Sequence, residues 1–380
     1  MVPASFRNVC VPTPPYSPCS SFLIRDSDTP DDCAKSPWVS PRRLRPSLSL
    51  SPVTWLSFTC ARIRAVCPAC AEADSQPANG GSRMKMHKGE VRIDRELVGR
   101  LVAAEFPALA GLPISAVQST GTVNAIYRLG DHLCARLPRL PSWARNLDQE
   151  VHWLPKLAPH LSLRIPELVA KGHATSWYPC SWAIYRWIEG QPYTDELIND
   201  QHQAARDLAQ FVTELRRIDP AAGAPRGGRR PLRELDADTR AAIRSARDVI
   251  ASDAAIAAWE RAIEAPAWDG TPAWIHTDLL RPNMLVDGAR LCAVIDFGGA
   301  GVGDPAADVI AAWSVFSHPA RGTFRGALDV DDGTWDRARG FALHQAAMII
   351  PYYAETNPGF AALAKRTVEE VLADISGNHS

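Results

Sequence analysis

The feature that most constrains the fold is a short run of polar residues in the C-terminal half of the chain. His276 and Asp278 follow an apolar segment, and Asn283 comes five residues after Asp278. Two short apolar segments come next, and Asp296-Phe297-Gly298 follows them directly. The spacing H-x-D-x-x-x-x-N followed by D-F-G is far more specific than any one of these residues, which alone would indicate turn chemistry or helix capping.

The segment between Asn283 and Asp296 predicts a hairpin. Met284–Val286 and Leu291–Ile295 have the composition of strands, and Asp287-Gly288 is a typical turn between them. Two strands that lie side by side bring the residue before the first strand close to the residue after the second. We therefore expect Asn283 to lie close to Asp296.

These side chains match the requirements of phosphoryl transfer. The reaction needs Mg²⁺ held by oxygen ligands and a carboxylate near the attacking hydroxyl. Asn283 and Asp296 would hold the metal, and Asp278 would face the acceptor hydroxyl and take its proton. His276 is expected to brace the loop rather than take part in the chemistry.

The region before this segment indicates a small sheet. Asp94 can cap a helix with an apolar face, and strands are predicted over Ile114–Ser119, Asn124–Leu129 and Leu133–Leu137. Thr120 and Gly121 lie in the loop between the first two strands, where backbone amides and hydroxyls can wrap a phosphate. An ordinary hairpin loop is the alternative, because a single glycine is a weak signal.

Arg136 ends an otherwise apolar strand, and Glu150 could be its partner. Apolar residues recur at helical spacing over Asn146–Leu157, so this helix would carry Glu150 across from the strand. A strand cation held by a helix carboxylate is typical of a phosphate clamp. The alternative is a surface ion pair.

The remaining chain is predicted to be a strand, a hinge and several helices. Ser181–Ile188 reads as an apolar strand whose aromatic residues are core, and Glu189-Gly190-Gln191-Pro192 breaks it as a hinge between lobes would. Helices are predicted over Gln201–Ile218, Thr239–Ala265 and Trp335–Ala354.

Residues 1–83 read poorly as a folded domain. They contain 12 of the 31 prolines and 6 of the 9 cysteines, without sustained periodicity. We interpret them as a disordered extension, and patterned sequence beginning just after Met84 suggests that translation starts there. Cys67 and Cys70 could form half of a zinc site, but no second ligand pair is visible, so incidental thiols are the preferred interpretation.

Charge and hydropathy limit the partners. The chain of 380 residues has 41 basic and 42 acidic side chains, which argues against a nucleic-acid binder, and no apolar run is long enough to span a membrane. Residues 191–380 carry 19 basic and 27 acidic side chains, which favours a cationic small molecule, although a solvated acidic surface explains the count equally well. Nothing in the sequence predicts an obligate protein partner, and we expect a cytoplasmic protein.

Three motifs together resemble the aminoglycoside phosphotransferase family, relatives of protein and choline kinases. They are Trp274-Ile275-His276-Thr277-Asp278-Leu279-Leu280-Arg281-Pro282-Asn283, Val294-Ile295-Asp296-Phe297-Gly298 and Gly303-Asp304-Pro305-Ala306-Ala307-Asp308. The resemblance extends from about Arg92 to Ala354. It implies an α+β, two-lobed, protein-kinase-like fold: a nucleotide-binding sheet lobe at 84–190 and a helical lobe at 191–380 with the acceptor pocket.

The resemblance also implies roles for individual residues. Asp278 matches the catalytic aspartate, and Asn283 and Asp296 match the magnesium ligands. Backbone groups around Arg186 and Ile188 match the hinge that holds the base of ATP or GTP, and Glu150 matches the helix glutamate. Arg136 is a departure, because many relatives have lysine there, but arginine can still reach phosphates in a bidentate manner.

Several alternatives stay open from the sequence alone. The resemblance implies that the acceptor is a small molecule with a hydroxyl group, and an aminoglycoside antibiotic is the first candidate. Enzymes with related folds accept macrolides, choline and homoserine, so these stay as alternatives. A nucleotide-binding pseudokinase scaffold and a zinc-binding interaction protein are rivals of other classes. Asp304 and Asp308 are interpreted as helix caps, and Arg281 could contact either a phosphate or a neighbouring carboxylate.

Overall fold

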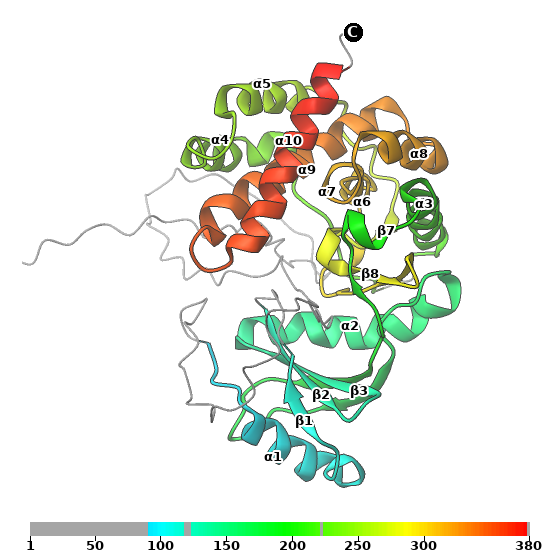
Figure 1. Ribbon diagram of the computed structural model, residues 1–380, viewed down its shortest axis with the longest axis vertical. Helices are drawn as coiled ribbons and strands as arrows, with labels where there is room; N and C mark the ends of the chain where they lie inside the picture. The colour runs from blue at the N-terminus through cyan, green and yellow to red at the C-terminus, as the bar shows by residue number, and fades with distance from the viewer. Residues whose placement is uncertain (1–89, 118–122, 221–222, 378–380) are drawn as a thin grey trace, which may run out of the picture.

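The computed structural model describes residues 90–117, 123–220 and 223–377. Figure 1 shows a lobe built on a sheet, joined to a larger lobe of helices. The predictions for residues 1–83, for Thr120 and for Gly121 lie outside the described residues. The predicted two-lobed α+β fold is confirmed.

The sheet lobe is a five-stranded antiparallel sheet in the order β1-β2-β3-β5-β4 with two helices. Asp94 caps the first helix, because its side chain accepts a hydrogen bond from the Leu97 amide. The elements are α1 (Arg95–Glu105), β1 (Ile114–Ala116), β2 (Asn124–Leu129), β3 (Leu133–Pro138), α2 (Ala144–Leu157), β4 (Leu168–Gly172) and β5 (Trp182–Arg186).

The sheet buries both faces, and the strand period of two separates them. Tyr127, Ala135 and Ile184 pack with α1 in one cluster. Their neighbours Ile126 and Cys134 belong to the cluster that continues into the helical lobe. Arg136 is two residues after Cys134 on β3, so its side chain shares the face toward the helical lobe.

The helical lobe contains two small sheets that carry the loop from His276 to Asn283. The antiparallel pair β8–β9 is the predicted hairpin, with β6 beside β8, and β7 pairs with β10. The elements are β6 (Gln191–Pro192), α3 (Gln201–Arg217), α4 (Asp236–Ser245), α5 (Ser252–Ile263), β7 (Ala273–Ile275), β8 (Met284–Asp287), β9 (Arg290–Val294), β10 (Gly301–Gly303), α6 (Ala306–Val309), α7 (Ala311–Ser314), α8 (His318–Leu328), α9 (Asp332–Tyr353) and α10 (Pro358–Gly377).

Two predictions about elements need correction. The single helix predicted over Thr239–Ala265 is two helices, α4 and α5, because the chain folds back so that Ile243 and Trp259 are both buried. The turn of the β8–β9 hairpin lies one residue later than predicted, at Gly288 and Ala289, which both have positive φ (56° and 63°). The prediction that the aromatic residues of this strand are core is confirmed for Trp182 and Tyr185, with exposed fractions of 0% and 3%. Trp187 follows the end of β5 and is only half-buried against the core.

Within the described residues, no helix has both the length and the apolar character needed to cross a bilayer.

Candidate active site

The loop from His276 to Asn283 follows β7 and is held in place by a helix carboxylate. Asp308 of α6 accepts a hydrogen bond from the His276 amide at 2.9 Å and from the Thr277 amide at 2.6 Å. Thr277 has a φ of 77°, which a threonine adopts only where its surroundings enforce it. Asp308 therefore fixes a strained turn immediately before Asp278.

His276 braces this loop from inside, as its interpretation as a structural residue requires. Its Nδ1 accepts a hydrogen bond from the Asp278 amide at 3.3 Å, which leaves the proton on Nε2 to be donated to the Ile295 carbonyl at 3.1 Å. The ring also contacts Phe297 edge-on at 4.7 Å. Burial lowers the pKa of His276 to about 3, so the imidazole is neutral.

Asp278 is 4% exposed and both of its carboxylate oxygens are engaged. Oδ1 accepts from Gln345 of α9 at 2.8 Å, and Oδ2 accepts from Asn283 Nδ2 at 2.9 Å. Burial, and then repulsion from Asp296, raise the pKa of Asp278 to about 7. A carboxylate with this pKa can take a proton from a hydroxyl near neutral pH.

Two residues near Asp278 were missed by the sequence analysis. Gln345 holds its carboxylate, and the charge of Arg229 opposes the rise in its pKa. Arg229 Nη1 also donates to the Thr277 carbonyl at 3.3 Å. The available signals were a glutamine inside an otherwise apolar helix and an arginine after Gly227-Gly228, and neither is specific.

Asn283 and Asp296 lie together after their strands fold as a hairpin, and each presents a buried oxygen. Asn283 Oδ1 and Asp296 Oδ2 have no hydrogen-bond partner within the described part of the chain. Asp296 has a φ of 73°, and burial raises its pKa to about 6 against the opposing charge of Arg136. Unpartnered buried oxygens are costly unless a cation or donor meets them, so this pair fits Mg²⁺.

A cluster of three or more histidine, cysteine, aspartate or glutamate side chains suited to a metal does not occur among the described residues. Magnesium at phosphate-transfer sites commonly takes only one or two protein ligands and completes its shell with phosphate and water oxygens. The Asn283–Asp296 pair agrees with this sparse ligation.

Arg136 and Glu150 form the predicted pair, and the pair is buried rather than on the surface. Arg136 Nη1 donates to Glu150 Oε1 at 2.7 Å, and Nη2 donates to Asp296 Oδ1 at 2.7 Å. Burial works to lower the pKa of Arg136, but the carboxylates of Glu150 and Asp296 outweigh it and raise the pKa. Burial raises the pKa of Glu150 to about 7, against the charge of Arg136.

Arg186 and Ile188 lie in the segment that leaves the sheet, and they help to line a pocket beneath it. The Arg186 amide donates to the Glu167 carbonyl, and its side chain pairs with the Glu167 carboxylate at 2.6 Å. The pocket is mostly apolar and reaches Arg136; its lining residues are Cys134, Arg136, Pro166, Tyr185, Arg186, Trp187, Ile188, Leu285 and Ile295.

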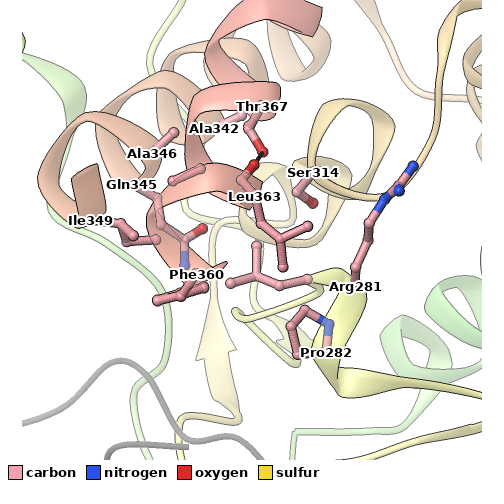
Figure 2. Close-up of a pocket in the computed structure, with 12 residues that line it drawn as sticks. Arg281, Pro282, Ser314, Ala342, Gln345, Ala346, Ile349, Phe360, Leu363 and Thr367 are labelled. Atoms are coloured by element: carbon pink, nitrogen blue, oxygen red, sulfur yellow. Dashed lines mark hydrogen bonds between the residues drawn. The ribbon is translucent and has the colours of Figure 1, made fainter. Parts of the chain in front are cut away.

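A second recess lies beside Asp278, between the loop and helices α9 and α10. Figure 2 shows Gln345, whose amide holds Asp278, in its wall, with Ile349, Phe360 and Leu363 facing the same space. Among the described residues that line it, Arg281 is the one with a charged side chain, and its guanidinium is held by the Asp195 carboxylate at 2.7 Å. The recess is therefore apolar, apart from Gln345 and two hydroxyl side chains, Ser314 and Thr367.

The structure decides three open interpretations. Arg281 contacts a neighbouring carboxylate, that of Asp195, and the Val315 carbonyl. Asp304 caps the start of α6 as interpreted, because its Oδ1 accepts a hydrogen bond from the Ala306 amide at 3.0 Å. The capping interpretation is wrong for Asp308. Its carboxylate accepts from the His276 and Thr277 amides of the loop that follows β7, and not from the amides of its own helix.

Comparison of the sequence with known proteins finds a matching family model and a similar enzyme. The model of the phosphotransferase enzyme family matches residues 117–341. Viomycin phosphotransferase from Streptomyces vinaceus is 28% identical over 275 residues, which cover 67% of this chain and 92% of that protein.

Solved structures show the same fold. An aminoglycoside phosphotransferase in complex with GDP and kanamycin has a TM-score of 0.60 at 19% identity, covering 74% of this chain and 99% of the other. Macrolide 2'-phosphotransferase type I has a TM-score of 0.50 at 17% identity, covering 73% of this chain and 98% of the other.

Proposed function

This chain belongs to the phosphotransferase enzyme family, and from this premise we propose that it moves the terminal phosphate of ATP or GTP to a hydroxyl group of an antibiotic. Membership makes it a kinase-type enzyme with an alcohol as acceptor. The observation that carries the proposal is the convergence of Asp278, Asn283 and Asp296 in one buried site, where two oxygens have no partner among the described residues.

Asp278 is the proposed general base. The acceptor oxygen forms a bond to the terminal phosphorus while its proton passes to the Asp278 carboxylate. The bond between that phosphorus and the oxygen bridging to the next phosphate breaks, and the nucleoside diphosphate leaves with the electron pair. Gln345 and Asn283 orient the carboxylate, and most of the rate enhancement comes from position and charge neutralisation.

Asn283 and Asp296 are the proposed magnesium ligands. Asn283 Oδ1 and Asp296 Oδ2, which have no partner within the described part of the chain, support this assignment. These residues would hold Mg²⁺, which would supply positive charge against the phosphates. Arg136, held by Glu150, extends the positive charge toward the phosphates, and Thr120 and Gly121 stay predicted as their backbone contacts.

The base of the nucleotide is proposed to occupy the pocket that Arg186 and Ile188 line. Its apolar walls suit a flat aromatic ring, and Arg136 in the same lining gives the phosphates a cation at one end. The amides of Arg186 and Trp187 are used by the Glu167 and His132 carbonyls, so we assign recognition of the base to the backbone of Ile188.

The acceptor is proposed to approach Asp278 from the recess of Figure 2. Viomycin and aminoglycosides are the first candidates, because the chain resembles enzymes named for them and is acidic in its C-terminal part. A macrolide is the second candidate, and the apolar lining of the recess favours it, since no carboxylate there could pair with a polycation.

The test is a mass-shift screen. Purified protein with Mg²⁺ and either ATP or GTP is incubated with viomycin, aminoglycosides, macrolides and simple alcohols, and each compound is examined for one added phosphate. Asp278→Asn serves as the inactive control. Nucleotide binding without phosphate transfer to any compound would favour the pseudokinase scaffold instead.

A further inference from the structure

Arg136 makes more contacts in fixed directions than a lysine at this position could make. Nη1 pairs with Glu150 of α2 and Nη2 pairs with Asp296, both at 2.7 Å. With its amide oxygen turned toward the guanidinium, Asn124 of β2 accepts from Nε at 2.9 Å and from Nη2 at 3.0 Å. Every nitrogen of the guanidinium therefore has a partner.

The bridge joins the two lobes. Arg136, Glu150 and Asn124 belong to the sheet lobe, whereas Asp296 follows β9 in the helical lobe. The side chains of Arg136, Glu150 and Asp296 are 4%, 0% and 1% exposed, so water competes little for these contacts. A planar fork can bind two carboxylates in fixed directions, while an ammonium group is a point charge without that geometry.

The two oxygens of Asp296 are in different situations. Oδ1 accepts from Arg136, and Oδ2 is buried without a partner in the described residues. A carboxylate held at one oxygen keeps the direction of the other. The free oxygen is therefore preorganised for a cation before any nucleotide binds.

We propose that Arg136 is a positioning residue for the magnesium site: its bond to Asp296 Oδ1, which joins the two lobes, fixes that carboxylate so that Oδ2 is directed toward the ion. The inference rests on the proposed function, because it assumes that Asp296 binds Mg²⁺. It concerns the arginine at this position and the interlobe bond, beyond the pairing with Glu150.

The experiment compares the Arg136→Lys variant with the wild-type protein, both as the full-length chain. A lysine can keep the pairing with Glu150 but lacks the planar fork that binds Asp296 in a fixed direction at the same time. Binding of a fluorescent ATP or GTP analogue is titrated against Mg²⁺. We expect the half-saturating Mg²⁺ concentration to rise about tenfold or more, as loss of one buried charged hydrogen bond implies. Binding without Mg²⁺ should change less than about threefold, because one cation still faces the phosphates.

Arg321 provides the matched control. It is equally buried, at 2% exposure, and bridges Asp374 and Glu370 of α10 away from the site. Arg321→Lys should lower the melting temperature and leave the Mg²⁺ dependence unchanged. An equal rise in the Mg²⁺ requirement in both variants would show a general loss of stability and overturn the proposal.

Glu150→Gln keeps the arginine and its bond to Asp296, so the half-saturating Mg²⁺ concentration should change less than about threefold. This variant also tests the proposal if Arg136→Lys gives no cooperative melt: a tenfold rise in Glu150→Gln would overturn it. Unchanged Mg²⁺ dependence, or tighter Mg²⁺ binding, in folded Arg136→Lys would overturn it too. Failure of the wild-type protein to bind either nucleotide would instead refute the proposed function, and the inference with it.

Discussion

Asp278 is a buried carboxylate whose environment favours the protonated form, yet its proposed role requires the ionised one. We predict that Asp278→Asn lowers the rate of phosphate transfer by about two to four orders of magnitude, because the general base is lost. The melting temperature at pH 8 should change little, because two effects oppose each other. Removal of the buried charge, whose burial raises the pKa of the native carboxyl to about 7, is stabilising, while the amide NH₂ cannot accept the hydrogen bond that one carboxylate oxygen accepts from Gln345 or Asn283. Rates and thermal melts of the variant check both expectations.

Asp287→Asn is the control for this experiment, because Asp287 is exposed in the β8–β9 hairpin. It should change neither the rate nor the melting temperature appreciably. Retained transfer in Asp278→Asn, with Asp287→Asn normal, would remove Asp278 from the mechanism.

His276 should make stability depend on pH. Burial lowers its pKa from 6.5 to about 3, so between these values the unfolded chain binds a proton that the folded chain does not. Stability contributed by neutral His276 is therefore present above pH 6.5 and lost as pH falls below it. We predict that His276→Gln, which can keep the donor to the Ile295 carbonyl, loses about 2 kcal/mol less unfolding free energy between pH 7 and pH 5 than the wild type.

Urea unfolding at pH 5, 6, 7 and 8 measures this difference, and the pH 8 values give the intrinsic cost of the substitution. If the unfolding free energies of the wild type and His276→Gln changed in parallel with pH, His276 would not be the source of the pH dependence, which would contradict this prediction.

Residues of the site differ in how readily the sequence reveals them. Asn283 and Asp296 are found from spacing because a hairpin of local residues brings them together. Gln345 and Arg229 reach Asp278 from other elements, and no short-range pattern marks them. Asp308 was noticed but assigned to its own helix, since local capping is the commoner use of an aspartate there.

At the level of elements, α6 stabilises the loop from His276 to Asn283 through Asp308. In Asp308→Asn one oxygen is replaced by an NH₂ group that faces a backbone N–H, so one buried donor among His276 and Thr277 loses its acceptor. We predict a loss of about 1–3 kcal/mol in unfolding free energy and a lower kcat, because Thr277 is no longer held in its strained conformation. Urea unfolding and steady-state rates test this.

The same substitution at Asp331 is the matched control. Asp331 caps α9 by accepting from the Thr334 amide, and asparagine is an equally good cap. Asp331→Asn should therefore leave kcat unchanged. Similar losses of kcat in both variants would show that Asp308 has no special relation to the loop.

Elements were predicted well where one periodicity dominates. The alternation along β2, β3 and β5 and the apolar stripe of α3 identify them correctly. The periodicity over Thr239–Ala265 predicts one helix, whereas the break comes from packing Ile243 and Trp259 against the same core. Tertiary packing of that kind leaves no local signal.

At the scale of the whole molecule, one apolar core crosses from the sheet lobe into the helical lobe. Ile126 and Tyr185 belong to the same cluster as Phe297 and Trp274, and the rings of Trp153 and Trp274 lie 4.9 Å apart across the lobes. We predict that the described lobes unfold in a single cooperative transition. Coincident urea curves from tryptophan fluorescence and far-ultraviolet circular dichroism would agree with this, and two separated midpoints would contradict it.

The family resemblance implied the fold class, whereas the charge composition did not reveal the character of the recess. Many carboxylates of the C-terminal part pair with arginines on and between helices, as Asp374 does with Arg321 and Asp236 with Arg240. None of these carboxylates lines the recess beside Asp278. A charge total gives no positions, so the acceptor could not be deduced from it.

The alternating faces of β3 restrict which changes of length this sequence can accept. Side chains alternate along the strand, so Arg136 shares the face of Cys134 toward the helical lobe, and Ala135 between them is directed to the opposite side. Insertion or deletion of one residue between Leu133 and Arg136 would turn the guanidinium into the apolar layer beneath α1. Variation in length among natural homologues should therefore fall in the Gly130-Asp131 turn and avoid the strand itself, leaving an uninterrupted block in any alignment.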